Sequence, residues 1–373
     1  MYYYEVERVY TMVKGLSMLR KTRGEKNVNS LVSVGEKTII GEEVSFEGSI
    51  RSTADLIING SVKGSVKLDN SLLTVAPKGQ VKAEIHAQNV SISGQLIGNI
   101  KVISNVEITK EADFSGQIKS KRVSIEDGAF LKAVIELEHE TQKKTLPTDT
   151  ISDQEANGLE KETLTLLKET ESSVISTHLL REEGSLDSEP VTTTSNVIQL
   201  FIDGLEQQQK GQVLDIGPVC SENINFLGQH VRTLYVCDMF RQLDRERHKD
   251  LPISNFWQHL DYPPQSFDGI LLWDLIDHLE DRDVYRLVEL CIKMLRPGGL
   301  LMIFSLGEQA TQTVVNSFVI GEDFRLDLRP QPHLDLLFHM RHNREILSLL
   351  TPFTLVKSFI YHNRLRQFLF QRD

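Results

Sequence analysis

The sequence predicts a protein of mixed fold class, with a β-solenoid, an acidic linker and a doubly wound α/β domain. Three observations predict this organisation. A five-residue apolar unit recurs six times early in the chain, a later stretch lacks aromatic residues, and the remainder alternates strand-like with helix-like segments. The chain has 373 residues, enough for two ordinary domains.

The repeated unit has the form apolar-x-small-x-Ile/Val. Its copies are FEGSI (46–50), VKGSV (62–66), VKAEI (81–85), LIGNI (96–100), FSGQI (114–118) and LKAVI (131–135). Alternating inward and outward residues are typical of short strands. One turn of about 17 residues cannot bury its own apolar face, so stacked turns must share a core. We expect the small third residue to lie where a neighbour crowds it. A β-sandwich also has short strands, but would not repeat one unit six times.

The repeats resemble the bactofilins, which are bacterial polymer-forming cytoskeletal proteins. The resemblance covers about residues 30–138 and is carried by TIIGEEVSFEGSI, LIINGSVKGSV and VSISGQLIGNI. It implies that residues 31–138 form a right-handed parallel β-helix that joins end to end into filaments without a nucleotide. Unpaired strand edges at the ends of a solenoid favour such self-association. A capped, monomeric β-helix is the alternative.

The segments on either side of the repeats differ in character. Residues 1–30 form a tail whose basic stretch starts at Met18. The resemblance implies that such a tail contacts the inner membrane surface, with a plain solvated tail as the alternative; either Met1 or Met18 is the start. Residues 139–195 are rich in Glu, Thr and Ser. They bury too little surface to offset chain entropy, so we expect a disordered acidic linker that lets the last domain move.

Composition restricts the partners and the setting. A net charge of −11 argues against a general nucleic-acid binder, which needs a basic surface. The cysteines Cys220, Cys237 and Cys291 lack CxxC spacing, which fits a reducing compartment and predicts no metal site. No run of about 18 apolar residues occurs. We therefore expect a cytoplasmic protein that associates with the membrane, if at all, through its tail on the cytoplasmic face.

Residues 196–373 alternate strands and helices. The expected strands are QVLDIG, TLYVCD, FDGILLWD and GLLMIFS, followed by an antiparallel pair, FTLVKSFIYHN and RLRQFLFQRD. A helix with a continuous apolar face precedes GLLMIFS and is expected to end at Pro297-Gly298-Gly299. In such sheets ligands bind beyond the carboxyl ends of the strands, at the point where strand order reverses.

This order of segments resembles the class I S-adenosylmethionine-dependent methyltransferases, a Rossmann-like fold. The resemblance is carried by VLDIG, LYVCD, SFDGILLWDLIDHLED and LRPGGLLMIFS. It implies S-adenosylmethionine as cofactor, with the loop after the first strand against its methionine part and Asp238 on its ribose hydroxyls. A carboxylate accepts two hydrogen bonds from a diol. The candidate cofactor-binding residues are Asp215, Gly217, Pro218, Asp238, Met239 and Trp273.

The loop after the first strand departs from the family pattern. The family has glycines where this chain has Val219 and Ser221, and a Cβ restricts both close approach and positive φ. Pro218 also removes a backbone donor. His278 lies between carboxylates and is the catalytic candidate, as a general base for methyl transfer to oxygen or nitrogen. A structural role for His278 is the alternative.

Two functions follow from these observations. The first is a cytoskeletal scaffold that carries a methyltransferase-like domain, with a methyl acceptor that variable loops would define. The second is a structural and interaction protein whose methyltransferase-fold domain is non-catalytic. The substituted glycines favour the second, whereas Asp215, Gly217, Asp238 and the LRPGG segment favour retained cofactor binding.

Overall fold

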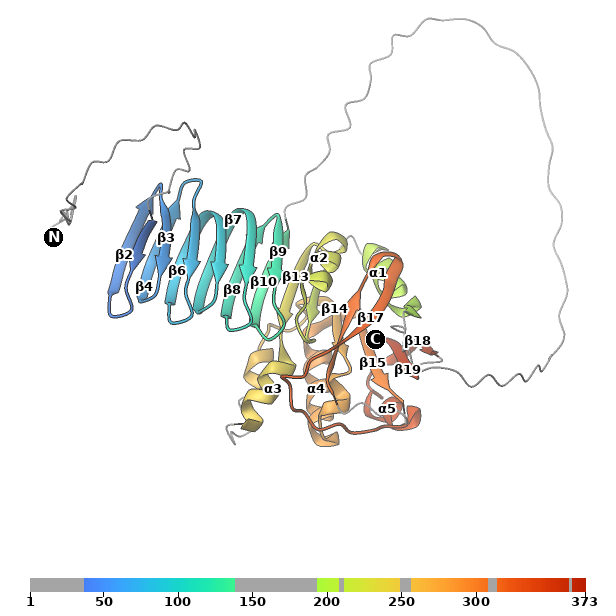
Figure 1. Ribbon diagram of the computed structural model, residues 1–373. Helices are drawn as coiled ribbons and strands as arrows, with labels where there is room; N and C mark the ends of the chain where they lie inside the picture. The colour runs from blue at the N-terminus through green and yellow to red at the C-terminus, as the bar shows by residue number, and fades with distance from the viewer. Residues whose placement is uncertain (1–36, 138–192, 208–210, 249–255, 308–313, 362–363) are drawn as a thin grey trace, which may run out of the picture. The chain divides into compact units, whose positions relative to one another are not determined.

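The computed structural model describes residues 37–137, 193–207, 211–248, 256–307, 314–361 and 364–373 (Figure 1). The predicted tail at 1–30, nearly all of the predicted linker at 139–195 and the alternative start at Met18 lie outside the described residues. Within these ranges, no helix is both long enough and apolar enough to cross a membrane.

Residues 37–137 form a β-helix of stacked parallel strands (Figure 1). Its strands are β1 (Lys37–Ile40), β2 (Ser45–Ser52), β3 (Asp55–Ile58), β4 (Ser61–Leu68), β5 (Leu72–Val75), β6 (Gln80–Ile92), β7 (Gln95–Ile108), β8 (Asp113–Ser120), β9 (Arg122–Ile125) and β10 (Phe130–Leu137). One parallel ladder runs through β2, β4, β6, β7, β8 and β10, and a second through β1, β3, β5, β6, β7 and β9. The inward residues of successive turns stack into one buried core.

The small residues of the repeat lie against the backbone of the preceding turn. Gly48 pairs in register with Gly64, and Gly98 pairs with Gly116. A Cβ atom on Gly64 would overlap the carbonyl of Gly48, and a Cβ on Gly116 would overlap that of Gly98. The expected crowding is therefore confirmed, and its source is the neighbouring turn of the stack.

The C-terminal region is an α/β domain around a mixed sheet in the order β13-β12-β14-β15-β19-β18. Strands β13, β12, β14 and β15 are parallel, whereas β19 and β18 are antiparallel to their neighbours. The elements are β11 (Thr193–Thr194), α1 (Asn196–Gln207), β12 (Gln212–Asp215), α2 (Ser221–His230), β13 (Thr233–Cys237), α3 (Met239–His248), η1 (Phe256–Leu260), β14 (Phe267–Trp273), η2 (Leu275–His278), α4 (Asp281–Met294), β15 (Leu295–Leu306), β16 (Asn316–Ile320), η3 (Glu322–Phe324), β17 (Arg325–Pro330), α5 (Asn343–Leu349), β18 (Thr354–Ile360) and β19 (Leu365–Gln371).

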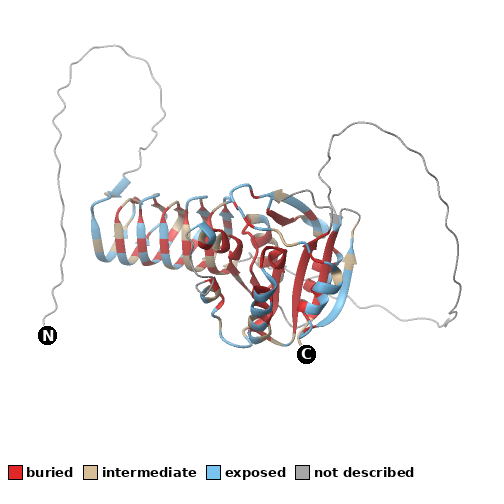
Figure 2. Cartoon of the chain, turned by 90° about the horizontal axis from the view of Figure 1, so that it is seen from below, coloured by how far each residue is buried: buried red, intermediate tan, exposed pale blue. Residues whose placement is uncertain are grey.

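Helices cover both faces of this sheet. Every residue of β14 is buried, as expected for a central parallel strand between two helical layers (Figure 2). Side chains of α1 and α2 pack in one apolar cluster with alternate strand residues, and side chains of α3, α4 and α5 pack in a second. This arrangement confirms the predicted doubly wound class and the antiparallel pairing of the last two strands.

The predicted end of the helix before GLLMIFS needs correction. Helix α4 ends at Met294, before Pro297, because Leu295 adopts an extended conformation and begins β15. Leu295 pairs with Phe267, so tertiary pairing draws the LRPGG segment into the sheet. After Leu306, strands β16 and β17 form a separate antiparallel sheet with β11.

The β-helix and the α/β domain share a strand ladder. Strand β10 pairs antiparallel with β13, from Lys132 opposite Cys237 to Ile135 opposite Leu234. The β-helix core and the α1/α2 side of the sheet also belong to one apolar cluster. The expectation of a domain that moves freely on its linker is therefore wrong for the described residues. The physical reason for this contact is that β10 and β13 are each the last strand of their own sheet. Their backbone N–H and carbonyl groups pair with one another across the domain boundary.

Candidate functional site

Asp215 is the hydrogen-bonding centre of the site predicted from sequence. It ends β12, and Trp273 ends the adjacent parallel strand β14, so both lie at the carboxyl edge of the sheet. Its Oδ1 accepts hydrogen bonds from the backbone N–H of Gly217 at 3.1 Å and from the indole Nε1–H of Trp273 at 2.7 Å. Burial raises the pKa of Asp215 to about 6, and these two hydrogen bonds oppose the rise.

The Trp273 side chain fills the space over Gly217. A Cβ atom on Gly217 would overlap the indole ring, which stacks on Phe318 with centroids 5.8 Å apart and planes 8° apart. The ring also meets Phe304 edge-on, and only 1% of Trp273 is exposed. The backbone φ angle of Trp273 is +53°, which is rare for a bulky residue. Packing and the Asp215 hydrogen bond hold this conformation in place.

Asp238 follows β13 directly and caps helix α3. Its Oδ1 accepts the backbone N–H of Arg241 at 2.8 Å, and its carboxylate also accepts the N–H of Val219. Burial raises the pKa of Asp238 to about 7 against these hydrogen bonds. The backbone N–H of Asp238 donates to the carbonyl of Leu131 in β10 at 3.1 Å. The residue predicted to bind ribose thus takes part in joining the two domains.

The residues around the first loop do not fit S-adenosylmethionine in this conformation. Pro218 and Val219 are buried, Met239 is fully buried, and Trp273 occupies the space above Gly217. Four surface cavities lined by described residues lie elsewhere, for example one between β10 and α2 that Leu137 and Gly228 help to line.

His278 lies in a separate buried cluster. Its Nδ1–H donates to the carbonyl of Leu337 at 2.9 Å, and its Nε2 is 3.6 Å from Oδ2 of Asp274. Burial lowers the pKa of His278, but interaction with the Asp274 carboxylate outweighs it, so the net pKa is raised. The imidazole ring of His278 meets the rings of Phe240 and Phe338 edge-on.

The surroundings of His278 leave it little access to a substrate. Only 6% of the residue is exposed. The carboxylate of Asp274 makes no hydrogen bond to the backbone at the start of η2, so its side chain does not cap η2. Asp277 instead accepts hydrogen bonds from Ser305 and the N–H of Leu306. The structural alternative for His278 fits this packing, and its role as a base stays a prediction.

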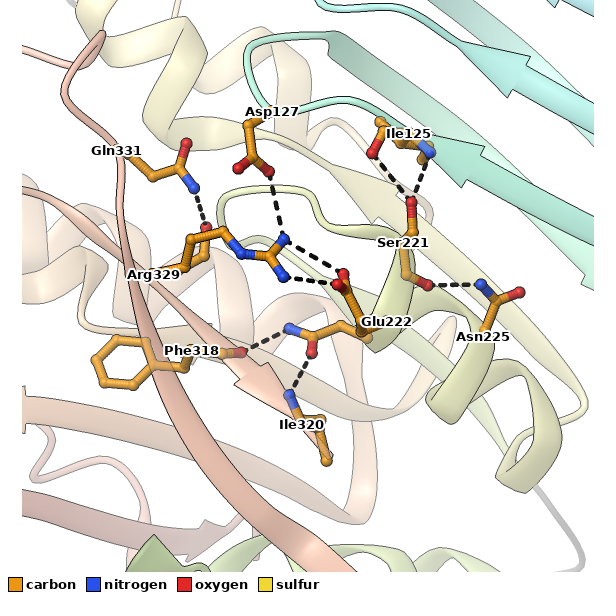
Figure 3. Close-up of polar contacts among 11 residues, drawn as sticks. Ile125, Asp127, Ser221, Glu222, Asn225, Phe318, Ile320, Arg329 and Gln331 are labelled. Atoms are coloured by element: carbon orange, nitrogen blue, oxygen red, sulfur yellow. Dashed lines mark hydrogen bonds and ion pairs between the residues drawn. The ribbon is translucent and has the colours of Figure 1, made fainter. Parts of the chain in front are cut away.

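The start of helix α2 binds the last turn of the β-helix (Figure 3). The hydroxyl of Ser221 accepts the N–H of Ile125 at 2.6 Å and donates to the carbonyl of Ile125 at 3.0 Å. The side-chain amide of Asn225 donates to the carbonyl of Val123 at 3.1 Å. In the part of the chain that the structure describes, no further turn lies beyond β9, and these two side chains take the place of the next strand.

Charged and amide groups extend this contact (Figure 3). Arg329 of β17 forms an ion pair with Glu222 at 2.6 Å and a longer one with Asp127 of the β-helix at 3.7 Å. The side chain of Asn223 donates to the carbonyl of Phe318 and accepts the N–H of Ile320, which ties α2 to β16. Asp127, α2 and the β16–β17 hairpin therefore form one polar network.

The structure brings together Asp215, Gly217 and Trp273, with Asp238 on the next strand. His278 contacts other residues. The docking role of Ser221, Asn225 and Arg329 was not predicted from the sequence. Ser221 stands where a cofactor loop would have glycine, which is a sequence signal, but its partner Ile125 lies in the other domain.

Comparison with known proteins gives two separate matches. Residues 38–136 match the bactofilin model, described as polymer-forming cytoskeletal. Bactofilin BacO of Myxococcus xanthus is 39% identical over 101 residues, which is 27% of this chain and 79% of the relative. Bactofilin BacP of the same organism is 33% identical over 102 residues, 27% of this chain and 42% of the relative. The β-helix is thus of the polymer-forming cytoskeletal class. The chain belongs to the bactofilin family.

The second match concerns the α/β domain. Residues 214–303 match a methyltransferase domain model, so a bactofilin domain and a methyltransferase domain are both present. Among solved structures, N-methyltransferase NodS from Bradyrhizobium japonicum WM9 in complex with S-adenosyl-L-homocysteine is 18% identical, with 47% of this chain and 84% of that chain covered and a TM-score of 0.29. The cofactor indicated for a methyltransferase domain is S-adenosylmethionine.

Proposed function

We propose that this chain is a self-associating scaffold subunit that carries a methyltransferase-fold domain fixed to one end of its β-helix. The observation that carries the proposal is the stack of parallel turns. Within the described ranges, its first strands are paired on one side only: β1 pairs with β3, and β2 with β4. An unpaired strand edge is a template for another chain. The matched family model also describes polymer-forming cytoskeletal proteins.

The test of self-association is the mass of the full chain in solution. Sedimentation velocity over a hundredfold range of concentration should show species heavier than the 42.4 kDa of one chain. A particle that stays at 42.4 kDa throughout would refute the scaffold function. We infer a cytoplasmic setting from three cysteines that are buried and free. Contact with the inner membrane surface stays a prediction, because it rests on residues 1–30.

Binding of S-adenosylmethionine is a second candidate function, and one observation favours it. Asp215 and Asp238 end the neighbouring strands β12 and β13, both are buried, and burial raises the pKa of each carboxyl. Buried carboxyls with raised pKa values at such an edge are typical of functional sites. When bound, the cofactor would supply an electrophilic methyl group. We propose that binding is weak, because it requires the Trp273 indole to leave Gly217.

Calorimetric titration of the full chain with S-adenosylmethionine tests this candidate. We expect weak binding, which Trp273→Ala strengthens at least tenfold because no indole has to be displaced. Trp257→Phe is the matched control, since Trp257 lies on η1 and does not contact Gly217. It should leave the affinity unchanged. Absence of binding in both the native chain and Trp273→Ala would leave the domain with a docking function alone, which is the non-catalytic alternative.

A further inference from the structure

We propose that the methyltransferase-fold domain closes the C-terminal end of the β-helix, so that the chain self-associates only through its N-terminal turn and forms a closed pair with a second copy. The proposal rests on the self-association proposed above and specifies the surface and the stoichiometry. It follows from a comparison of the two ends of the β-helix.

The C-terminal end is closed on both of its strands. The outer edge of β10 is paired with β13 over four residues, Lys132 to Ile135. The outer edge of β9 is capped by Ser221 and Asn225. A further β-helix turn would need these same backbone groups. A second copy therefore cannot stack here while the α/β domain is docked.

Further contacts hold the cap in place. Arg245 of α3 pairs with Asp113 at 3.4 Å and lies over the Phe130 ring, 4.8 Å from its centroid. Leu137 packs so closely on Gly228 of α2 that a Cβ there would contact its Cδ1 at 2.5 Å. Apolar residues of the last turns and of α2 also belong to one buried cluster. The cap is an extended interface, with a strand ladder, ion pairs and an apolar core.

The N-terminal turn is open by contrast. Among the described residues, β1 and β2 each pair with one strand only. Ile39 is 62% exposed. Ile40 and Phe46 are only partly buried, whereas Ile58 and Val62, their register partners in the next turn, are fully buried. An apolar, unpaired edge of this kind favours association with another strand edge.

Two glycines indicate that the missing neighbour is a turn of the same kind. A Cβ on Gly60 would overlap the carbonyls of Gly41 and Val44, just as one on Gly64 would overlap that of Gly48. At Gly41 and Gly48 themselves, a Cβ would meet only side chains of the same turn, at 3.9 Å and 3.4 Å. These glycines leave room for a backbone that the described residues of this chain do not supply. The occupant is therefore a second copy that presents the same face.

One open end allows only one arrangement. A filament needs two complementary ends on every subunit, whereas a single self-complementary face generates a two-fold pair and stops. In such a pair the β2 edges of the two copies run antiparallel. The expected particle has twice the mass of one chain, and each α/β domain lies at an outer end, away from the contact.

The experiment measures the mass of the full chain and of two variants. The native chain should reach twice 42.4 kDa and grow no further with concentration, with no filaments by negative-stain electron microscopy. Ile39→Lys, on the open edge, should halve the mass. The matched control Ile103→Lys replaces an isoleucine that is 55% exposed within β7 and should leave the pair intact. Circular dichroism and thermal melting confirm that both variants fold.

Other outcomes overturn the inference in distinguishable ways. Filaments of the native chain would show that the C-terminal end is available, and self-association would stand without the closed pair. If the Ile39→Lys variant still forms a pair, the contact lies elsewhere on the chain. That result would overturn the inference about the N-terminal turn but would leave the proposed self-association standing. A particle of one chain at every concentration, as would arise if residues before β1 covered this face, would refute both the pair and the proposed self-association.

Discussion

At the residue scale, Asp215 is a buried carboxyl whose charge state affects stability. Its pKa is raised by burial from 3.8 to about 6. Between these values the folded state binds more protons than the unfolded state, so the free energy of unfolding falls as pH rises from about 4 to about 6. The rise corresponds to roughly 3 kcal/mol, since each pKa unit is about 1.4 kcal/mol.

Replacement of Asp215 by Asn tests this linkage. Both hydrogen bonds of Asp215 end on Oδ1, so the amide oxygen of Asn can keep the bonds to Gly217 and Trp273 while the titration is lost. Urea unfolding at pH 4 and pH 7.5 should show Asp215→Asn gaining about 2 to 3 kcal/mol on the native chain as pH rises. An equal pH dependence in both proteins would show that Asp215 titrates normally.

At the element scale, helix α2 illustrates how a cofactor-loop segment has acquired another contact. In this chain the loop after β12 is buried, and the helix that follows directs Ser221 and Asn225 at β9. A small polar side chain at position 221 can both donate to and accept from the backbone of Ile125, which glycine cannot do. Ser221, which stands in the predicted cofactor loop, therefore stabilises the contact between the domains.

Ser221→Ala should destabilise the full chain by about 1 to 3 kcal/mol, because the buried N–H and carbonyl of Ile125 lose their partner. The matched control is Ser124→Ala, an exposed serine on the same strand β9, which should change stability by less than about 0.5 kcal/mol. Urea denaturation measures both. Equal effects of the two substitutions would argue against the capping role of Ser221.

At the scale of the whole molecule, the two domains should unfold together. The core of the β-helix and the α1/α2 side of the sheet form one apolar cluster, and the β10–β13 ladder crosses the boundary. Both tryptophans, Trp257 and Trp273, lie in the α/β domain, whereas most strand residues lie in the β-helix. Fluorescence therefore reports on one domain and far-ultraviolet circular dichroism mainly on the other.

Coincident transitions by the two probes are expected for a cooperative unit. Thermal or urea unfolding of the full chain should give the same midpoint by tryptophan fluorescence and by circular dichroism. Two well-separated midpoints would show that the interface contributes little to stability, and that the α/β domain does not act as a fixed cap on the β-helix.

The sequence by itself determined the class of each domain and the register of the β-helix. The five-residue unit appears six times, and the structure pairs these units in register because equal inward residues must stack on one another. The strands VLDIG, LYVCD, FDGILLWD and GLLMIFS were also identifiable, because buried parallel strands are continuous apolar runs. Local pattern carries this information.

Only the tertiary structure decided what the first loop contacts. Trp273 lies 58 residues from Asp215, and Ser221 lies 96 residues from Ile125, so no local pattern relates them. The space over Gly217 is filled because of the conformation of the Trp273 side chain. Strand β9 is capped because the α/β domain contacts that end of the β-helix. The physical reason is that unpaired edges and unfilled volumes are properties of packed surfaces, which exist only after the chain has folded.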